Sequence, residues 1–201
     1  MARTKTVISA MRKKIHVRGR GWVFTPMEFA SLGSRAAIDQ ALSRLQRSGS
    51  IRRLARGLYE FPRIHPRIGV LSPSPEAVAK AVAAKTHSRL LISEAKAANL
   101  LGLSTQVPAQ NVFLTDGPTR KVQVGRQTIV LKHAAPSRMV GAGSEAGIII
   151  QAVRSFGPKA TEEIPVESLS KRLPVRVKSD LKRLASSAPA WSQPVLKKIA
   201  N

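Results

Sequence analysis

Cysteine is absent from the 201-residue sequence. Disulfides, thiolate catalysis and cysteine-based zinc sites are therefore excluded, and a reducing compartment is compatible with this composition. No apolar run approaches the roughly 18 residues that a membrane helix needs, and the basic N-terminal segment lacks an apolar stretch of signal-peptide length. We therefore expect a cytoplasmic protein that has no membrane partner.

Aromatic and acidic residues are also scarce. Aromatics make up 4% of the chain, which argues against the base-stacking platforms of single-strand binders. Asp and Glu number 11 against 34 Lys and Arg, for a formal net charge of +23, while 43% hydrophobic residues suffice for a packed core. Such a surface attracts polyanions, and nucleic acid is the natural one, although a generally basic, solvated protein is an alternative.

The few acidic residues and histidines form no catalytic or metal-binding pattern. Glu162 and Glu163 are sequence neighbours that would point apart on a helix, and they suit its first turn. The four histidines are scattered, without the spacing of a ligand pair. The glycines between 141 and 147 lack the final spacing of a dinucleotide fingerprint. We expect no enzymatic activity, no cofactor and no metal ion.

The N-terminal third predicts a helix-turn-helix. Apolar residues at helical spacing predict a first helix from Thr4 to about Ile15. The segment Thr25-Pro-Met-Glu28 predicts the start of a second helix, with Thr25 as its cap and Glu28 returning a bond to the Thr25 amide. This helix is expected to end near Gly33, where glycine permits a tight turn.

Ser34 opens the next predicted helix, which runs from Arg35 to about Arg47 and is ended by Gly49. In a helix-turn-helix the second helix lies in the major groove, and its N-terminal residues reach base edges. Arginine can form two hydrogen bonds with guanine, and glutamine can form two with adenine. We therefore expect Ser34, Arg35 and Gln40 to contact base edges. Arg44 and Arg47, further along the helix, are expected to contact phosphates. The predicted DNA-binding residues of this segment are Ser34, Arg35, Gln40, Ser43, Arg44 and Arg47.

A basic hairpin follows. Two β-prone runs flank Ala55-Arg-Gly57, and Arg52, Arg53 and Arg56 lie on or near the tip. With Trp22–Phe24 as a first strand or packed turn, this order matches a winged helix, whose wing can follow a phosphate backbone or enter the minor groove. The alternative is a solvated edge that only discourages strand pairing.

The expected fold class is α+β, in two domains joined by a linker. We expect a winged helix-turn-helix in residues 1–62, a proline-rich linker in 63–75 and a mixed α+β domain in 76–201. Short β-type segments at 112–115, 121–124 and 128–131 predict a small antiparallel sheet. The final region, 164–201, has eight Lys and Arg against two acids, which suits either a solvated helical face or an extension of the nucleic-acid surface.

Six segments carry a family resemblance: Gly21–Phe29, Ser34–Leu45, Ile51–Tyr59, Ala98–Ser104, Gln106–Pro108 and Phe113–Pro118. They resemble the AbiEi-type antitoxins, which belong to bacterial abortive-infection, type IV toxin–antitoxin modules. The resemblance implies a repressor that binds inverted repeats in double-stranded DNA at its own promoter. It also implies a C-terminal domain that opposes a nucleotidyltransferase-like toxin without a stable complex. No Asp-x-Asp pair follows Gly143-Ser144, so the chain is not the toxin itself.

Three other functions fit parts of this pattern. A winged-helix transcriptional regulator with a ligand- or partner-sensing C-terminal domain would show effector-dependent DNA affinity. An RNA-binding or nucleic-acid-processing enzyme would need a group of acids or histidines that the sequence does not indicate. A structural basic protein that coats DNA would not distinguish a promoter from a random duplex.

Overall fold

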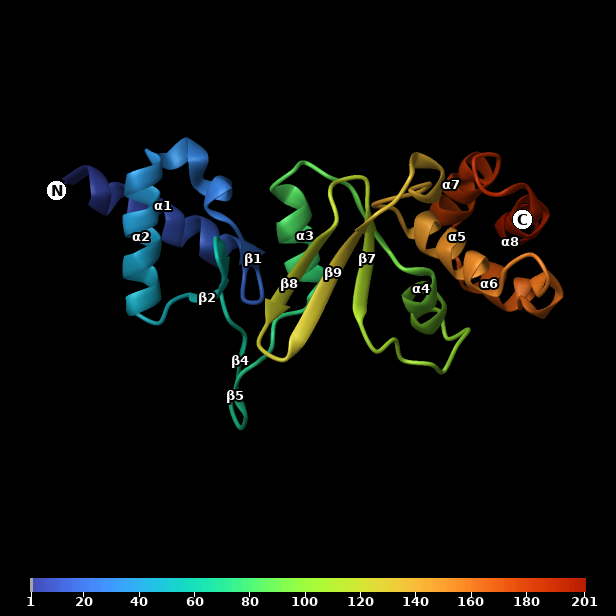
Figure 1. Cartoon of the computed structure of the whole chain (residues 1–201), viewed down its shortest axis with the longest axis horizontal. Helices are drawn as coiled ribbons and strands as arrows, with labels where there is room; N and C mark the ends of the chain where they lie inside the picture. The colour runs from blue at the N-terminus through green and yellow to red at the C-terminus, as the bar shows by residue number, and fades with distance from the viewer. Residues whose placement is uncertain (1) are drawn as a thin grey trace. The chain divides into compact units, whose positions relative to one another are not determined.

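A computed structural model describes residues 2–201, with side chains from residue 6 onward, as a mixed α+β protein (Figure 1). The chain divides into two compact units, one formed by residues 1–87 with 121–129 and the other by residues 88–120 with 130–201. These units do not coincide with the expected division at residues 62 and 76. The helix that follows the proline-rich segment is grouped with the N-terminal residues.

The first unit holds helices and short strands in alternation. Its elements are α1 (Ala2–Arg18), β1 (Val23–Phe24), the 3-10 helix η1 (Pro26–Leu32), α2 (Arg35–Arg47), β2 (Arg52–Ala55), β3 (Leu58–Glu60), β4 (Ile64–His65), β5 (Gly69–Val70) and α3 (Pro75–Ala84). Strands β1, β3 and β2 form an antiparallel sheet in that order, and β4 pairs with β5. The segment expected as a plain linker therefore contains a small hairpin.

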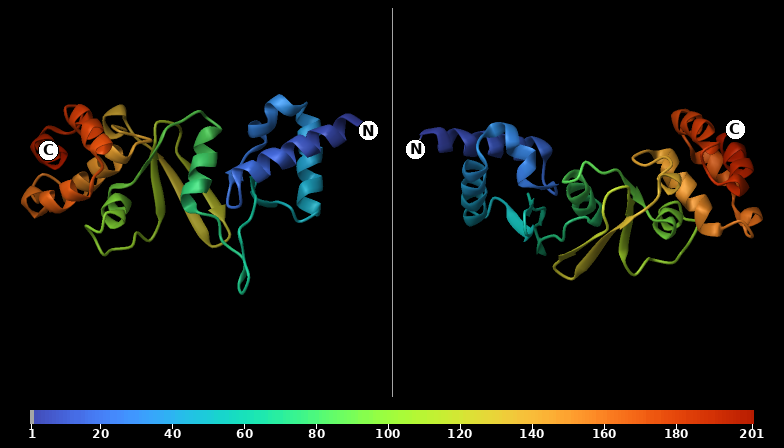
Figure 2. Two further views of the ribbon diagram at one scale, coloured as in Figure 1. Left: turned by 180° about the vertical axis from the view of Figure 1, so that it is seen from behind. Right: turned by 45° about the horizontal axis from the view of Figure 1, so that its top comes forward.

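One apolar core joins α1, η1 and α2 to a face of the β1–β3–β2 sheet, and α1 and α2 lie side by side in both figures (Figures 1 and 2). Met11 of α1 and Leu42 of α2 are completely buried in it. Phe24 and Phe29 meet edge to face, with ring centroids 5.4 Å apart, an arrangement that the charge distribution of aromatic rings favours. The other face of the sheet, which carries Val23, is packed against α3.

The predicted cap at Thr25 is wrong. Thr25 makes no side-chain capping bond and is buried, and the following segment is a 3-10 helix. Glu28 instead forms an ion pair with Lys14 of α1, with 3.7 Å between Oε2 and Nζ. The Lys14 amine also donates a hydrogen bond to the backbone carbonyl of Glu28. Packing against α1 therefore outcompetes the local capping pattern that the sequence predicts.

Gly33 at the turn has a different role from the expected one. Its φ of 166° is extended backbone that any residue adopts, so the turn does not require glycine for its dihedral angle. A Cβ at this position would lie 3.2 Å from Cγ2 of Val7. A side chain here would therefore require Val7 of α1 to shift by a few tenths of an ångström, so glycine suits the close approach of α1 to the turn.

The second unit combines a sheet with a helical bundle. Its elements are β6 (Leu90–Ile92), α4 (Glu94–Leu100), β7 (Asn111–Thr115), β8 (Arg120–Val124), β9 (Gln127–His133), η2 (Pro136–Arg138), α5 (Glu145–Phe156), η3 (Thr161–Glu163), α6 (Val166–Arg172), α7 (Val175–Ala185), η4 (Ala190–Ser192) and α8 (Gln193–Ala200). The sheet order is β6–β7–β9–β8. Residues 121–129, which make up most of β8 and the start of β9, are grouped with the first unit. The three predicted β segments are confirmed, and β6 is an additional strand.

Helices α5 to α8 lie together toward the C-terminus (Figure 2). They share one apolar core, in which Leu181, Leu196 and Ile199 are completely buried. Helix α5 is capped by Ser144, whose hydroxyl accepts a hydrogen bond from the Gly147 amide at 3.1 Å. Within residues 2–201 no helix is both long enough and apolar enough to span a bilayer.

Candidate nucleic-acid interface

Helix α2 has the bounds that the sequence predicts, Arg35–Arg47, and exposes one long side. The side chain of Ser34 caps it by accepting a hydrogen bond from the Ala37 amide at 3.3 Å. Its buried residues all lie on one stripe, formed by Ile38, Ala41, Leu42 and Leu45. Because this stripe faces the core, the opposite side of the helix is left to solvent.

The polar residues predicted on α2 lie on that solvent side. Arg35, Gln40, Arg44 and Arg47 are exposed, and Ser43 is half-buried between them. At 100° per residue, the positions 40, 43 and 47 fall within one narrow arc of the helix. The structure therefore brings these three side chains onto one face. Arg44 lies about 40° beyond one edge of this face, whereas Arg35 lies about 80° beyond the other edge, near the direction of buried Leu42.

An acidic residue also lies on this face. Asp39 accepts a hydrogen bond from Nε of Arg35 at 2.8 Å, and both side chains are largely exposed. Exposed pairs of this spacing stabilise a helix by only a few tenths of a kcal/mol, about 0.3–0.5. The position of Asp39 four residues after Arg35 is the signal in the sequence that indicates such a pair. Asp39 thus forms an ion pair with Arg35, a candidate base-reading residue.

The basic hairpin is formed by β2 and β3 as predicted, with Gly57 in the turn at a φ of 67°. Arg53 and Arg56 are exposed, and Nε of Arg53 donates to the Ala55 carbonyl at 3.3 Å. A Cβ at Gly57 would lie 3.6 Å from Nζ of Lys85, which follows α3. Lys85 thus brings a third positive charge beside the turn. The sequence does not indicate this charge, because Lys85 is 28 positions after Gly57.

Arg52 differs from the other predicted contacts. Its Nε donates to Oε2 of Glu60 at 2.6 Å, and its Nη2 donates to the Leu71 carbonyl at 2.5 Å. The side chain of Glu60 has no exposed surface, whereas that of Arg52 is 33% exposed. The guanidinium of Arg52 therefore stabilises the hairpin through Glu60 and the Leu71 carbonyl, and only part of this side chain is open to a partner such as DNA.

Several other cations of the first unit are engaged in packing. A cavity of about 510 Å³ beside Trp22 is bordered by Arg18, Arg20 and Lys80. The guanidinium of Arg18 stacks over the Trp22 ring, while that of Arg20 lies over Phe61 and donates to the Pro62 carbonyl at 2.9 Å. All four arginines are exposed, but Arg18 and Arg20 also contact aromatic rings, whereas no such contact is found for Arg53 or Arg56 in the described part of the chain.

No cluster of three or more His, Asp or Glu side chains that could hold a metal ion is found in the described part of the chain. Three acids of the first unit, Glu28, Asp39 and Glu60, form ion pairs. What the first unit presents is a polar, mainly basic helical face and an arginine-bearing turn. Such an arrangement can donate hydrogen bonds to phosphates and base edges.

The fold class is mixed α+β, and the comparisons with known proteins add a family. The model described as "Family of unknown function (DUF6088)" matches residues 10–181, and the chain belongs to this family. No curated protein matches the chain. Among solved structures, it is similar to the RV2827C protein from Mycobacterium tuberculosis, at 18% identity and a TM-score of 0.44, over 98% of this chain and 82% of that one. A likeness at this level assigns neither a function nor a partner.

Proposed function

We propose that the chain is a DNA-binding antitoxin and transcriptional repressor, without enzymatic activity, of a cytoplasmic type IV toxin–antitoxin system. In this proposal the first unit is a winged helix-turn-helix, in which α2 enters the major groove of promoter inverted repeats and the β2–β3 hairpin is the wing. The observation that carries the DNA-binding part is the exposed polar face of α2, opposite its buried stripe.

The expected roles differ between the two elements. Arg35 and Gln40 near the start of α2 suit base edges, whereas Arg53 and Arg56 of the hairpin suit phosphates. Contacts to phosphates release condensed counterions, so each one steepens the fall of affinity with salt. Base contacts carry the sequence preference instead.

Fluorescence anisotropy with two labelled duplexes tests this division of roles. One duplex carries the promoter repeat upstream of the gene, and the other is a scrambled sequence of equal length. The variant Arg35→Ala/Gln40→Ala is expected to lose most of the preference for the repeat, and Arg53→Ala/Arg56→Ala to weaken both duplexes and flatten the salt dependence. Equal binding of the repeat by Arg35→Ala/Gln40→Ala and the unmodified chain would contradict the groove assignment.

The antitoxin part is supported by the resemblance of the six segments to AbiEi-type antitoxins. Co-expression with a neighbouring nucleotidyltransferase-like gene tests it directly. Growth that is restored by the full chain, and equally by a chain with Arg53→Ala/Arg56→Ala, would separate neutralisation of the toxin from repression. If no variant of the chain restores growth beside such a toxin, the antitoxin assignment fails while DNA binding stands.

A second candidate function is a winged-helix transcriptional regulator whose second unit senses a ligand. A cavity of about 480 Å³ in that unit favours it. The two candidates differ in whether a small molecule changes the affinity for DNA.

A further inference from the structure

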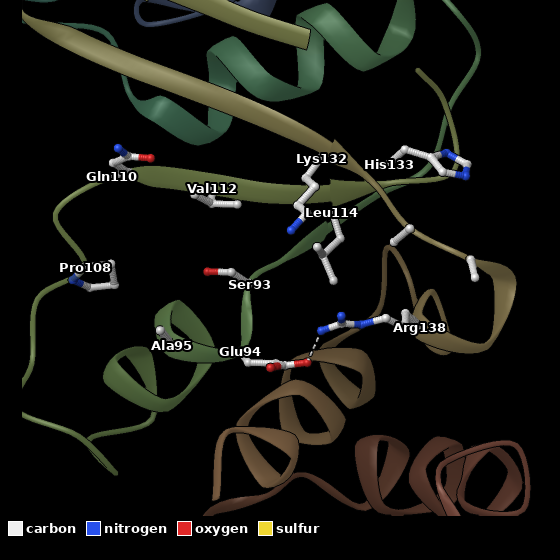
Figure 3. A pocket seen from close by; sticks show the side chains of 12 residues that line it. Ser93, Glu94, Ala95, Pro108, Gln110, Val112, Leu114, Lys132, His133 and Arg138 are labelled. Carbon is white, nitrogen blue, oxygen red and sulfur yellow. Dashed lines mark hydrogen bonds and ion pairs between the residues drawn. The ribbon is translucent and has the colours of Figure 1, made fainter. Parts of the chain in front are cut away.

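The cavity in the second unit lies between the sheet and helix α4 (Figure 3). Strand β7 supplies Val112 and Leu114, the end of β9 supplies Lys132, and the short helix η2 supplies Arg138. Its volume of about 480 Å³ falls within the range of about 300–1,000 Å³ that is usual for small-molecule sites.

One side of the cavity is apolar. Leu114 is 6% exposed, and Val112, Pro108 and Ala95 border the same space. Figure 3 shows Leu114 directed from the strand toward α4. This side can cover the hydrocarbon part of a ligand, which gains from removal of apolar surface from water.

The other side carries two cations and one acid. Lys132 is exposed and extends from β9 toward the same space, and no ion pair to Lys132 is found within residues 6–201 (Figure 3). Arg138 enters from the far side and is paired with Glu94 at the start of α4. Because Glu94 is paired with Arg138, it does not neutralise the positive charge of Lys132.

Helix α5 fixes the position of Arg138. Gln151, which is completely buried, donates from Nε2 to the Arg138 carbonyl at 3.2 Å, and Nη2 of Arg154 donates to the Ser137 carbonyl at 3.0 Å. Burial lowers the pKa of Arg154 from its ordinary value, with a smaller opposing effect of Glu94. A guanidinium is not deprotonated at neutral pH in proteins, so Arg154 adds to the positive field around the turn.

We propose that this cavity binds a small organic monoanion, with its acidic group between Lys132 and Arg138 and its apolar body against Val112 and Leu114. Glu94 selects against a second negative charge, because a multiply charged phosphate would bring like charges together at the mouth. A carboxylate on a hydrocarbon chain meets both requirements. This inference stands whether or not the first unit binds DNA.

Isothermal titration calorimetry of the full chain with octanoate tests the proposal, with acetate and octanol as comparison ligands. Octanoate is expected to bind with saturation at one molecule per chain. Acetate lacks the apolar body and octanol lacks the charge, so each is expected to bind at least about tenfold more weakly, as the loss of one of two favourable contributions implies. Equal binding of octanol, or no saturable binding of octanoate, would overturn the proposal.

A matched pair of variants locates the site. Lys132→Gln is expected to weaken octanoate binding by about tenfold, the loss of one charge-assisted hydrogen bond. Lys171→Gln makes the same charge change on the exposed side of α6 and is expected to leave the affinity unchanged. An equal loss in both variants would show attraction to a generally basic surface and would contradict a defined site. Both lysines are exposed, and a circular dichroism spectrum of each variant confirms that it is folded.

Discussion

Arg52 and Glu60 face each other across the β2–β3 pair, with 2.6 Å between Nε of the guanidinium and Oε2 of the carboxylate. The other carboxylate oxygen of Glu60 is buried and has no hydrogen-bond partner in the described part of the chain. Arg52 also reaches the Leu71 carbonyl, so it links the hairpin to the segment before α3. A buried acid that relies on a single cation makes that cation a structural requirement.

Arg52→Ala is therefore expected to lower the free energy of unfolding. Removing one partner of a fully buried ion pair costs about 3–5 kcal/mol, and the partial exposure of Arg52 reduces this to about 2–4 kcal/mol. Urea denaturation followed by circular dichroism measures the difference. The control is Arg53→Ala, at the next position on the exposed side of the strand, which is expected to change stability by less than about 0.5 kcal/mol. Equal losses at the two positions would contradict the structural role of Arg52.

The same pair allows a rescue experiment. The double variant Arg52→Met/Glu60→Met removes both charges and keeps similar side-chain length, so it is expected to recover most of the stability that Arg52→Ala loses. Its urea midpoint is compared with those of the unmodified chain and of Arg52→Ala. A double variant that is less stable than Arg52→Ala would show that the acid is needed for another reason.

On helix α2, the acid Asp39 is predicted to weaken DNA binding. Asp39→Asn frees Arg35 and removes a negative charge from the proposed groove face, so affinity for duplex DNA is expected to rise by about two- to fivefold at low salt. Because the pair is exposed, the stability of the chain is expected to stay within about 0.5 kcal/mol. Anisotropy titrations at two salt concentrations measure the change.

The matched control for this prediction is Asp180→Asn. Asp180 also pairs with a nearby arginine of its own helix, Arg183, but it lies on α7 of the second unit. The substitution makes the same change in net charge. If both variants raised the affinity equally, the effect would reflect net charge and not the position of Asp39 on α2.

Local signals in the sequence predicted the bounds of the elements that carry the candidate interface. Ser34 and the apolar stripe predicted where α2 begins and ends, and the Ala55-Arg-Gly57 turn predicted the β2–β3 hairpin. These features depend on neighbouring residues, which a sequence displays directly. The capping pattern at Thr25 was equally local, but a tertiary ion pair between Lys14 and Glu28 accompanied a different conformation.

Sequence could not separate Arg52 from Arg53. Neighbouring residues of a strand point to opposite faces, so one of the two had to face inward, but the register decides which one. That register places Arg52 opposite Glu60, and an irregularity follows between Arg53 and Ala55. The cavity beside α4 was equally hidden, since its lining comes from segments that are distant in sequence.

A close backbone contact in the second unit predicts an intolerant glycine. A Cβ at Gly147 of α5 would lie 2.1 Å from the Gly141 carbonyl oxygen, which already accepts hydrogen bonds from the amide and the hydroxyl of Ser144. Glycine to alanine within a helix ordinarily stabilises by about 0.5–1 kcal/mol. Here Gly147→Ala is expected to destabilise by at least about 3 kcal/mol, because neither backbone segment can yield without loss of the cap.

Thermal and urea denaturation of Gly147→Ala and Ser144→Ala check this prediction. Ser144→Ala removes only the capping side chain and is expected to cost about 1 kcal/mol. The informative result is which of the two variants loses more free energy of unfolding, and we expect the larger loss in Gly147→Ala. A Gly147→Ala chain that is as stable as the unmodified one would contradict the close approach of the two segments.

The pair Arg89–Asp116 predicts a pH-dependent contribution to stability. Oδ2 of Asp116 accepts a hydrogen bond from Nε of Arg89 at 2.7 Å, and Oδ1 accepts one from the Arg89 amide at 2.8 Å. The side-chain bond from Arg89 is the largest influence and holds the pKa of Asp116 below its ordinary value of 3.8, against a weaker effect of burial. Since the folded-state pKa is depressed, the contribution is present above about pH 4 and is lost as the pH falls through the lowered value.

A double-mutant cycle with Arg89→Gln, Asp116→Asn and their combination isolates this contribution. Thermal denaturation midpoints are measured at intervals from pH 2.5 to pH 7, values chosen to bracket the ordinary pKa of 3.8. The coupling between the two side chains is expected to be constant above about pH 4 and to shrink toward zero in acid, because protonated Asp116 no longer carries the charge that Arg89 stabilises. A coupling that grew as the pH fell would contradict the lowered pKa, and a coupling of zero at pH 7 would show that the two side chains do not interact in solution.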